Sequence, residues 1–188
     1  MRRVWLISVC LSFLIFVPAG SYSINNVGKV LKVKNTVFIV RNGQKKNAKP
    51  LMPIMLEDEV ATGKKSRARL MFKDDSVLNL GELSRVIVKE YMSSPGTKRS
   101  KSIYKLIDGY LKVIVGKSNL RVHSPTAVVA ARGTEFVLWM EGDGPSMATS
   151  IVMLEGEAEL RNINELVIGT VVIGKGQMSR VFRNKSPE

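Results

Sequence analysis

The sequence predicts an all-β protein with a single domain of many short strands. After residue 24, no segment keeps the apolar spacing of three and four residues that marks an amphipathic helix. Short β-branched runs recur instead, separated by Gly, Asn, Asp and Ser. One of these runs leads into Asn42-Gly43, a pair that favours a tight hairpin turn because both residues accept positive φ.

Each predicted strand is an apolar or alternating run that ends at a turn-forming residue. In chain order the predicted strands are residues 30–33, 37–40, 51–56, 68–72, 77–80, 85–89, 103–107, 110–115, 120–123, 128–131, 134–140, 150–154, 157–161, 166–172 and 177–182. Ala158 and Leu160 alternate with charged residues, which predicts one buried and one solvated face. The spacing of the runs is compatible with a sandwich, a barrel or a β-coil.

Residues 1–23 are predicted to be a signal peptide, helical before its removal. Arg2 and Arg3 precede an apolar run over residues 4–17, and small residues follow it, so that cleavage after Ser21 or after Ser23 fits. An uncleaved anchor is the alternative, although the run is shorter than the roughly 20 residues of a spanning helix. We expect a periplasmic or secreted protein with a β domain at 24–183 and a disordered tail at 184–188. Cys10, the only cysteine, lies in the apolar run, so the mature chain has no disulfide.

The chain is strongly basic, with 29 Lys and Arg against 16 Asp and Glu and a net charge of +13. Removal of the signal peptide leaves about +11. For an exported protein this excess favours anionic envelope polymers and lipid headgroups as neighbours, and it does not indicate nucleic acid. Contact with a membrane is expected only through an uncleaved signal segment. The sequence leaves the oligomeric state open.

One corner of the predicted fold resembles a known family signature. The small apolar run at 127–131 leads into Arg132-Gly133-Thr134-Glu135-Phe136, and this stretch is similar to the signature of the FecR domain. The segments at 56–63, 68–81, 152–158 and 174–177 are also similar to FecR strands and turns, so the resemblance covers residues 28–181. It implies a β-solenoid-like stack or twisted sandwich of short strands, and a non-enzymatic role.

FecR itself couples an outer-membrane transporter to a sigma factor through a cytoplasmic segment, a membrane helix and a periplasmic domain. Only three residues precede the apolar run here, so we expect no sigma-factor-binding segment. The resemblance therefore predicts a binding, assembly or sensory accessory module that acts through another envelope protein.

The sequence predicts no catalytic, cofactor or metal residues. His123 is the only histidine, and the next residue, Ser124, would point to the opposite face of a strand. Glu157 and Glu159 share a strand face, but a glycosidase places its two carboxylates across a cleft. An envelope hydrolase that uses these two glutamates is a third, weaker hypothesis. Residues 62–66 resemble a phosphate loop, but no helix follows them.

Two groups of charged residues remain as candidate sites. We interpret Arg132 as structural, bonded to backbone carbonyls or to Glu135, with Gly133 permitting the close approach. The alternative is a recognition corner in which Arg132 binds a partner's carboxylate or phosphate. A possible anion-binding set is formed by Lys64, Lys65, Arg67, Lys98, Arg99 and Lys101. If these residues do more than solvate loops, the protein is a cationic binder of anionic glycan or lipopolysaccharide, the alternative to the accessory module.

Overall fold

The computed structural model describes residues 26–92 and 100–188, which form two β-sheets packed face to face. Sheet A contains, in spatial order, β17 (Met178–Phe182), β14 (Ala148–Glu155), β13 (Glu135–Glu141), β10 (Tyr110–Ile114), β7 (Val77–Leu80), β6 (Arg67–Phe72), β1 (Asn26–Lys34) and β4 (Pro53–Met55). Sheet B contains β16 (Thr170–Gly174), β15 (Glu157–Asn162), β12 (Ala127–Ala131), β11 (Ser118–His123), β9 (Ser100–Asp108), β8 (Arg85–Met92), β5 (Glu59–Thr62), β2 (Val37–Arg41) and β3 (Gln44–Asn47).

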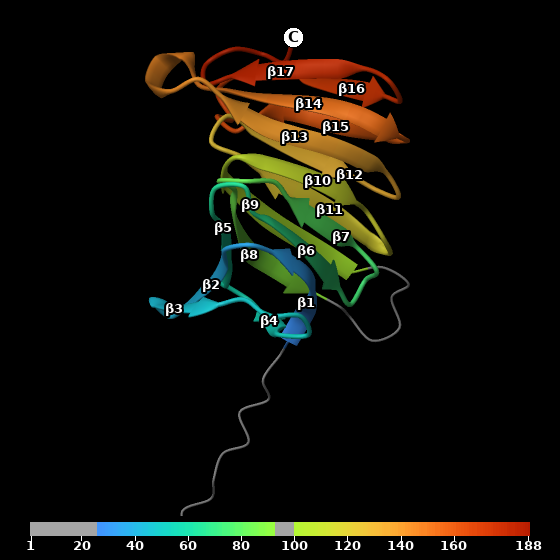
Figure 1. The fold of residues 1–188 in the computed structure, drawn as a ribbon. Helices are drawn as coiled ribbons and strands as arrows, with labels where there is room; N and C mark the ends of the chain where they lie inside the picture. The colour runs from blue at the N-terminus through green and yellow to red at the C-terminus, as the bar shows by residue number, and fades with distance from the viewer. Residues whose placement is uncertain (1–25, 93–99) are drawn as a thin grey trace, which may run out of the picture.

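The chain climbs the molecule by crossing repeatedly between the two sheets. Figure 1 shows the result as a stack with the first strands at one end and β16 and β17 at the other. Among the described strands, β9 and β11 pair in parallel, because β10 crosses to the other sheet between them. All other strand pairs in the described residues are antiparallel. The predicted all-β, solenoid-like twisted sandwich is confirmed.

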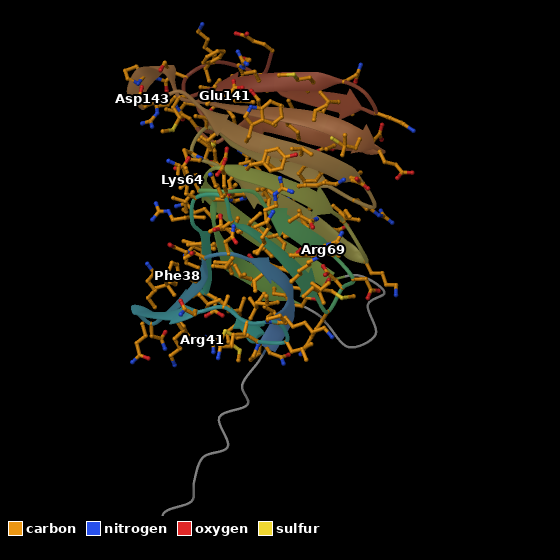
Figure 2. All side chains as sticks on the ribbon, viewed as in Figure 1. Phe38, Arg41, Lys64, Arg69, Glu141 and Asp143 are labelled. Carbon is orange, nitrogen blue, oxygen red and sulfur yellow. The ribbon has the colours of Figure 1, made fainter. Side chains whose placement is uncertain are left out.

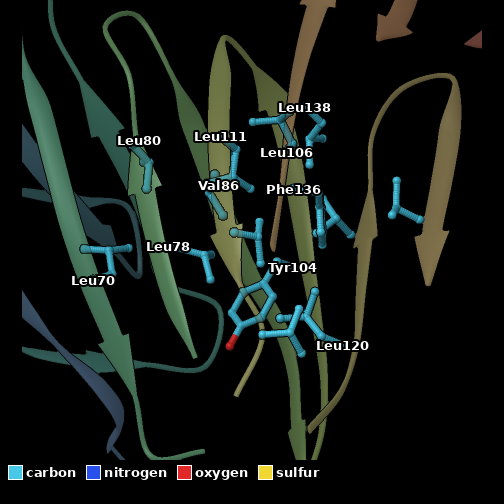
Figure 3. Packing of buried hydrophobic residues seen from close by; sticks show 14 of the residues in the cluster. Leu70, Leu78, Leu80, Val86, Tyr104, Leu106, Leu111, Leu120, Phe136 and Leu138 are labelled. Carbon is cyan, nitrogen blue, oxygen red and sulfur yellow. The ribbon is translucent and has the colours of Figure 1, made fainter. Parts of the chain in front are cut away.

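The core is the layer of side chains between the two sheets. Alternate residues of each strand point inward, so sheet A contributes Leu78 and Phe136 and sheet B contributes Tyr104 and Leu120, all almost fully buried (Figure 3). The ring of Tyr104 meets Phe72 edge to face at 4.8 Å between centroids. Each such side chain contributes about 1.5–3 kcal/mol on burial, so this layer is the main source of stability.

Tight turns and buried polar groups close the ends of the strands. Asn42 and Gly43 both have positive φ, as the predicted hairpin between β2 and β3 requires. Asp75 also has positive φ, so it takes a conformation usually left to glycine. At the first end of the stack the carboxylate of Asp58 is completely buried, receives two hydrogen bonds of 2.7 Å from Arg41, and accepts the amide of Met55.

Several predicted boundaries differ from the structure. Strands β3 and β5 were not predicted, the run at 51–56 supplies only β4, and the run at 166–172 supplies a strand that starts at Thr170. The tail was expected to be disordered, but Glu188 exchanges two backbone hydrogen bonds with Arg180 of β17. A short 3-10 turn, η1 (Gly144–Ser146), occupies the loop predicted at 142–145. The predicted signal peptide lies outside the described residues. Within the described ranges no helix has the length and apolar character needed to cross a membrane.

Candidate binding surface on the outer face of sheet B

The outer face of sheet B brings together residues that lie far apart in the sequence. Arg121 of β11 pairs with Ala130 of β12, which pairs with Glu159 of β15, which pairs with Val172 of β16. Leu120, Val129 and Leu160 belong to the core, so their neighbours in this row point outward. A single row across four strands therefore runs from a cation, over a small residue, to a carboxylate and then to an exposed apolar side chain.

A shallow groove of about 540 Å³ follows this row. Ala130 leaves the space between Arg121 and Glu159, because its methyl group is the smallest side chain in the row. The residues that line the groove are Lys101, Asn119, Leu120, Arg121, Ala130, Ala131, Arg132, Glu157, Ala158, Glu159 and Val172. The groove therefore has a basic wall on the β11 side and an acidic wall on β15.

Four charged side chains around the groove have no partner among the described residues. Arg121, Arg132, Glu157 and Glu159 make neither an ion pair nor a side-chain hydrogen bond within residues 26–92 and 100–188. Lys101, on the same rim, is paired with Glu90 at 2.9 Å. As far as residues 26–92 and 100–188 are concerned, a ligand can reach these four groups without first breaking an internal contact.

On the outer face of sheet A, the charges near the β17 end are already paired. Glu141 accepts a hydrogen bond of 2.6 Å from the indole Nε1 of Trp139 and pairs with Arg180 at 2.7 Å. Lys112 pairs with Glu135 at 2.6 Å. Figure 2 shows Glu141 near the β17 end of this face. These charges of sheet A are paired, whereas the four around the groove of sheet B have no partner among the described residues.

A second feature of the same face is a cluster of cations around His123. Its imidazole is half-buried, and this burial lowers the pKa of His123, as do the charges of Arg161, Arg121 and Lys105. The Nε2 atom is shielded from solvent and has no hydrogen-bond partner among the described residues. Arg161 reaches Glu165 at only 4.0 Å, a weak pair in solvent. The local potential beside the groove is therefore positive.

The predicted signature corner is partly structural, but the contacts predicted for Arg132 are not seen among the described residues. Phe136 is fully buried and Thr134 is nearly so, while Arg132 is exposed on the groove rim and Glu135 binds Lys112 instead. Gly133 has a φ of +62°, yet a Cβ there would meet nothing within 4 Å. Its role is thus the backbone conformation of the corner, and the close approach predicted at Gly133 is not seen.

The tight contact at this corner occurs at another glycine. A Cβ on Gly156, in the turn between β14 and β15, would lie 2.7 Å from Cγ2 of Thr134. The backbone at Gly156 can therefore lie directly against the signature threonine because it carries no side chain. Sequence reasoning assigned this constraint to the wrong residue of the pair.

The predicted anion-binding residues do not form one patch. Lys101 lies at the first end of β9. Lys64 and Lys65 follow β5 and lie beside Glu82, near the opposite end of β9. Nine residues of strand separate the two ends by roughly 25 Å. Figure 2 shows Lys64 at one side of the stack. Arg67 begins β6 in sheet A, and Lys98 and Arg99 lie outside the described residues.

The residues considered for catalysis are spread over different environments. Ser124 is buried and hydrogen bonds to Thr149 at 2.7 Å, while His123 points to the outer face. Glu157 and Glu159 lie side by side on the exposed face of β15. Within the described residues no group of three or more His, Cys, Asp or Glu side chains converges as a metal site would require. Sequence reasoning missed Arg121, although the alternation of residues 119–123 places it outward.

The fold and this surface define a twisted two-sheet β stack with a charged groove on one outer face. The chain belongs to the FecR family: the model described as FecR protein matches residues 58–159. This confirms the resemblance seen in the sequence. The matched segment runs from β5 to β15 and includes the signature corner and most of the groove.

The fold is also similar to two crystal structures of a candidate anti-sigma factor from Parabacteroides distasonis, with TM-scores of 0.50 and 0.52. In both comparisons 12% of residues are identical, and the match covers 66% of this chain and 55% of that one. The chain thus spans about half the length of that protein, and the likeness concerns the fold alone. A search among curated proteins finds no match.

Proposed function

We propose that this FecR-family protein is a non-enzymatic accessory module of the bacterial cell envelope that binds a protein partner through the outer face of sheet B. The observation that carries the proposal is the set of four charges around the groove that have no partner in the described part of the chain. Arg121 and Arg132 on one wall and Glu157 and Glu159 on the other offer both signs of charge within one surface. Mixed charge of this kind favours a polypeptide surface over a uniform polyanion.

The family and the fold neighbours support a sensory or regulatory role for this module. The neighbouring structures are of a candidate anti-sigma factor. The basic and apolar start of the sequence supports export, so we place the module in the periplasm or outside the cell. A binding role needs no reactive cleft, in keeping with the exposed positions of Glu157 and Glu159.

Site-specific photo-crosslinking in cells tests this proposal. A photoreactive residue in place of Arg132 or Glu159 is expected to trap one discrete partner protein. The matched control replaces Arg69, which lies on the outer face of sheet A, and is expected to trap none of it. Identical adducts from both faces, or no protein adduct from sheet B, would contradict the proposal.

A second candidate function rests on the cations around His123. Lys105, Arg121 and Arg161 could bind an anionic glycan or lipopolysaccharide through charge alone. Binding of this kind would weaken steeply with salt, because exposed charges are screened beyond about 8 Å at physiological ionic strength. The double variant Arg121→Gln, Arg161→Gln should then bind more weakly than the parent protein to vesicles containing lipopolysaccharide. The double variant Lys64→Gln, Lys65→Gln should bind as the parent does. Equal loss in both variants would indicate diffuse attraction without a site.

A further inference from the structure

The two sheets have four edge strands, and three of them are protected against pairing with another chain. At the first end of the stack, β3 carries Lys45 and Lys46 and β4 is a three-residue strand that starts with Pro53. At the other end, the backbone of Arg180 in β17 is paired with Glu188 in both directions at 3.0 Å. Charge, proline and a covering segment are the devices that proteins use to block edge pairing.

In the part of the chain that the structure describes, the fourth edge, β16, has none of these devices. Its sequence is Thr170-Val171-Val172-Ile173-Gly174, without charge or proline. Val172 is 57% exposed, and the nearby Leu166 and Ile168 are each 89% exposed. Ser186 of the tail reaches the carbonyl of Ile168, so the tail touches only the approach to this strand. An apolar, uncharged edge of this kind is a template for a further strand.

Both faces of an added strand can be deduced from the register. Val171 and Ile173 pair with Leu160 and Ala158, which belong to the core side of β15. An added strand would therefore place apolar side chains on this inner side and cover Val171, which is 37% exposed. The inner face of the incoming segment must be apolar.

The outer face of an added strand lies opposite the acidic wall of the groove. Val172 separates the added strand from Glu159. Glu157 lies on the same face of β15, and Arg161 lies on it opposite Thr170, at the other end of the strand. Two strand spacings put the added strand about 10 Å from β15, a gap that a long Lys or Arg side chain can cross over Val172. The incoming segment is therefore basic on its outer face.

The distribution of charge along the whole chain also favours a basic segment at the β16 end. Residues 26–140 contain 22 Lys and Arg against 9 Asp and Glu, whereas residues 141–188 contain 5 against 7. The β16 end is thus the acidic end of a basic protein. It complements a cationic segment and not another acidic one.

We infer that β16 accepts an extended segment of a partner protein in which apolar residues alternate with Lys or Arg, and that this segment extends sheet B by one strand. This inference rests on the proposed function and specifies how its partner is held. Backbone hydrogen bonds to the edge supply affinity, and the alternation supplies specificity. The acidic wall of the groove reads the basic side chains of the segment.

Synthetic peptides test the inference with the whole exported chain. The probe is a labelled eight-residue peptide of alternating Val and Lys, compared with one of alternating Val and Glu and one with four Val followed by four Lys. Only the alternating Val-Lys peptide is expected to bind tightly, and it should slow amide hydrogen exchange in residues 170–174. Equal binding of the Val-Glu peptide, or binding without protection of these amides, would overturn the inference.

Two variants locate the contact on β16. Val172→Lys places a charge on the open edge and should weaken binding by about tenfold or more, which corresponds to 1.4 kcal/mol. Met178→Lys is the matched control, because Met178 is 52% exposed on β17, the edge already paired with Glu188. Equal effects of both variants would contradict a specific role for β16. Unchanged melting temperatures would show that both variants fold.

Two outcomes separate this inference from the proposed function. If crosslinking at Arg132 traps a partner but alternating peptides do not bind, the accessory module stands and strand addition fails. If the chain instead forms a dimer that Val172→Lys dissolves, as light scattering would show, the edge pairs with a second copy and the inference is overturned.

Discussion

The two ends of the stack solve the problem of the sheet edge differently. The first end is closed by a charged hairpin strand, a proline-containing strand and the ion pair of the half-exposed Arg41 with the buried Asp58. The other end covers β17 with Glu188 but leaves β16 open and apolar. The fold therefore does not require that every sheet edge be blocked, and the open edge at β16 is free to bind another segment.

The largest expected effect breaks the closed end. Asp58→Ala removes a fully buried carboxylate that binds Arg41 and the amide of Met55, and should lower the free energy of unfolding by about 3 kcal/mol. Urea unfolding measures it. Glu57→Ala is the control, since its pair with Lys89 is exposed and should be worth under about 1 kcal/mol. Equal losses would mean that the buried carboxylate of Asp58 does not hold this end together.

A smaller effect is expected at the corner that supports the open end. Gly156→Ala adds a Cβ 2.7 Å from Thr134 at a φ of +76°, and should destabilise the fold by about 2 kcal/mol. Gly176→Ala has a similar φ of +78° but meets nothing within 4 Å, so strain alone should cost about 1 kcal/mol. The difference between the two melting temperatures isolates the contact with Thr134. Equal melting temperatures would show that the backbone at this corner shifts to accommodate the added methyl group without a measurable cost.

The smallest expected effect concerns the protonation of His123 on β11, between the two ends of the stack. The pKa of His123 is lowered, so the folded state favours neutral imidazole, and its contribution to stability is full above about pH 6.5 and is lost as the pH falls below it. Because the ring is half-exposed, the loss should stay under about 1 kcal/mol.

As the only histidine, His123 gives one imidazole signal in an NMR titration. The midpoint should lie below 6.5 and rise in Arg161→Gln, since Arg161 is the largest of the charge contributions. Lys64→Gln is the control, because Lys64 lies away from this cluster. A midpoint that Arg161→Gln leaves unchanged would remove the evidence for a positive field on sheet B.

The local pattern of apolar and turn-forming residues predicted most of the strands. The features that it did not predict depend on pairing between residues far apart in the sequence. Strand β3 consists of Gln and Lys with Asn, so nothing in its composition indicates a strand; it forms because the Asn42-Gly43 turn folds it back onto β2. The groove combines residues from 101 to 172, and no local pattern indicates that Arg121 and Glu159 share a row. The sequence placed Arg132 in the signature corner, but among the described residues its side chain has no partner there, and Glu135 pairs with Lys112 of the neighbouring strand.

Beyond the first few strands, the order of strands in both sheets follows the order of the chain. Each newly formed strand can therefore dock onto a template that is already complete, so folding can advance from the β1 end as the polypeptide becomes available. At every stage the growing front exposes an unpaired backbone, which is where misassembly with neighbouring chains would begin. In the finished molecule that front survives as β16.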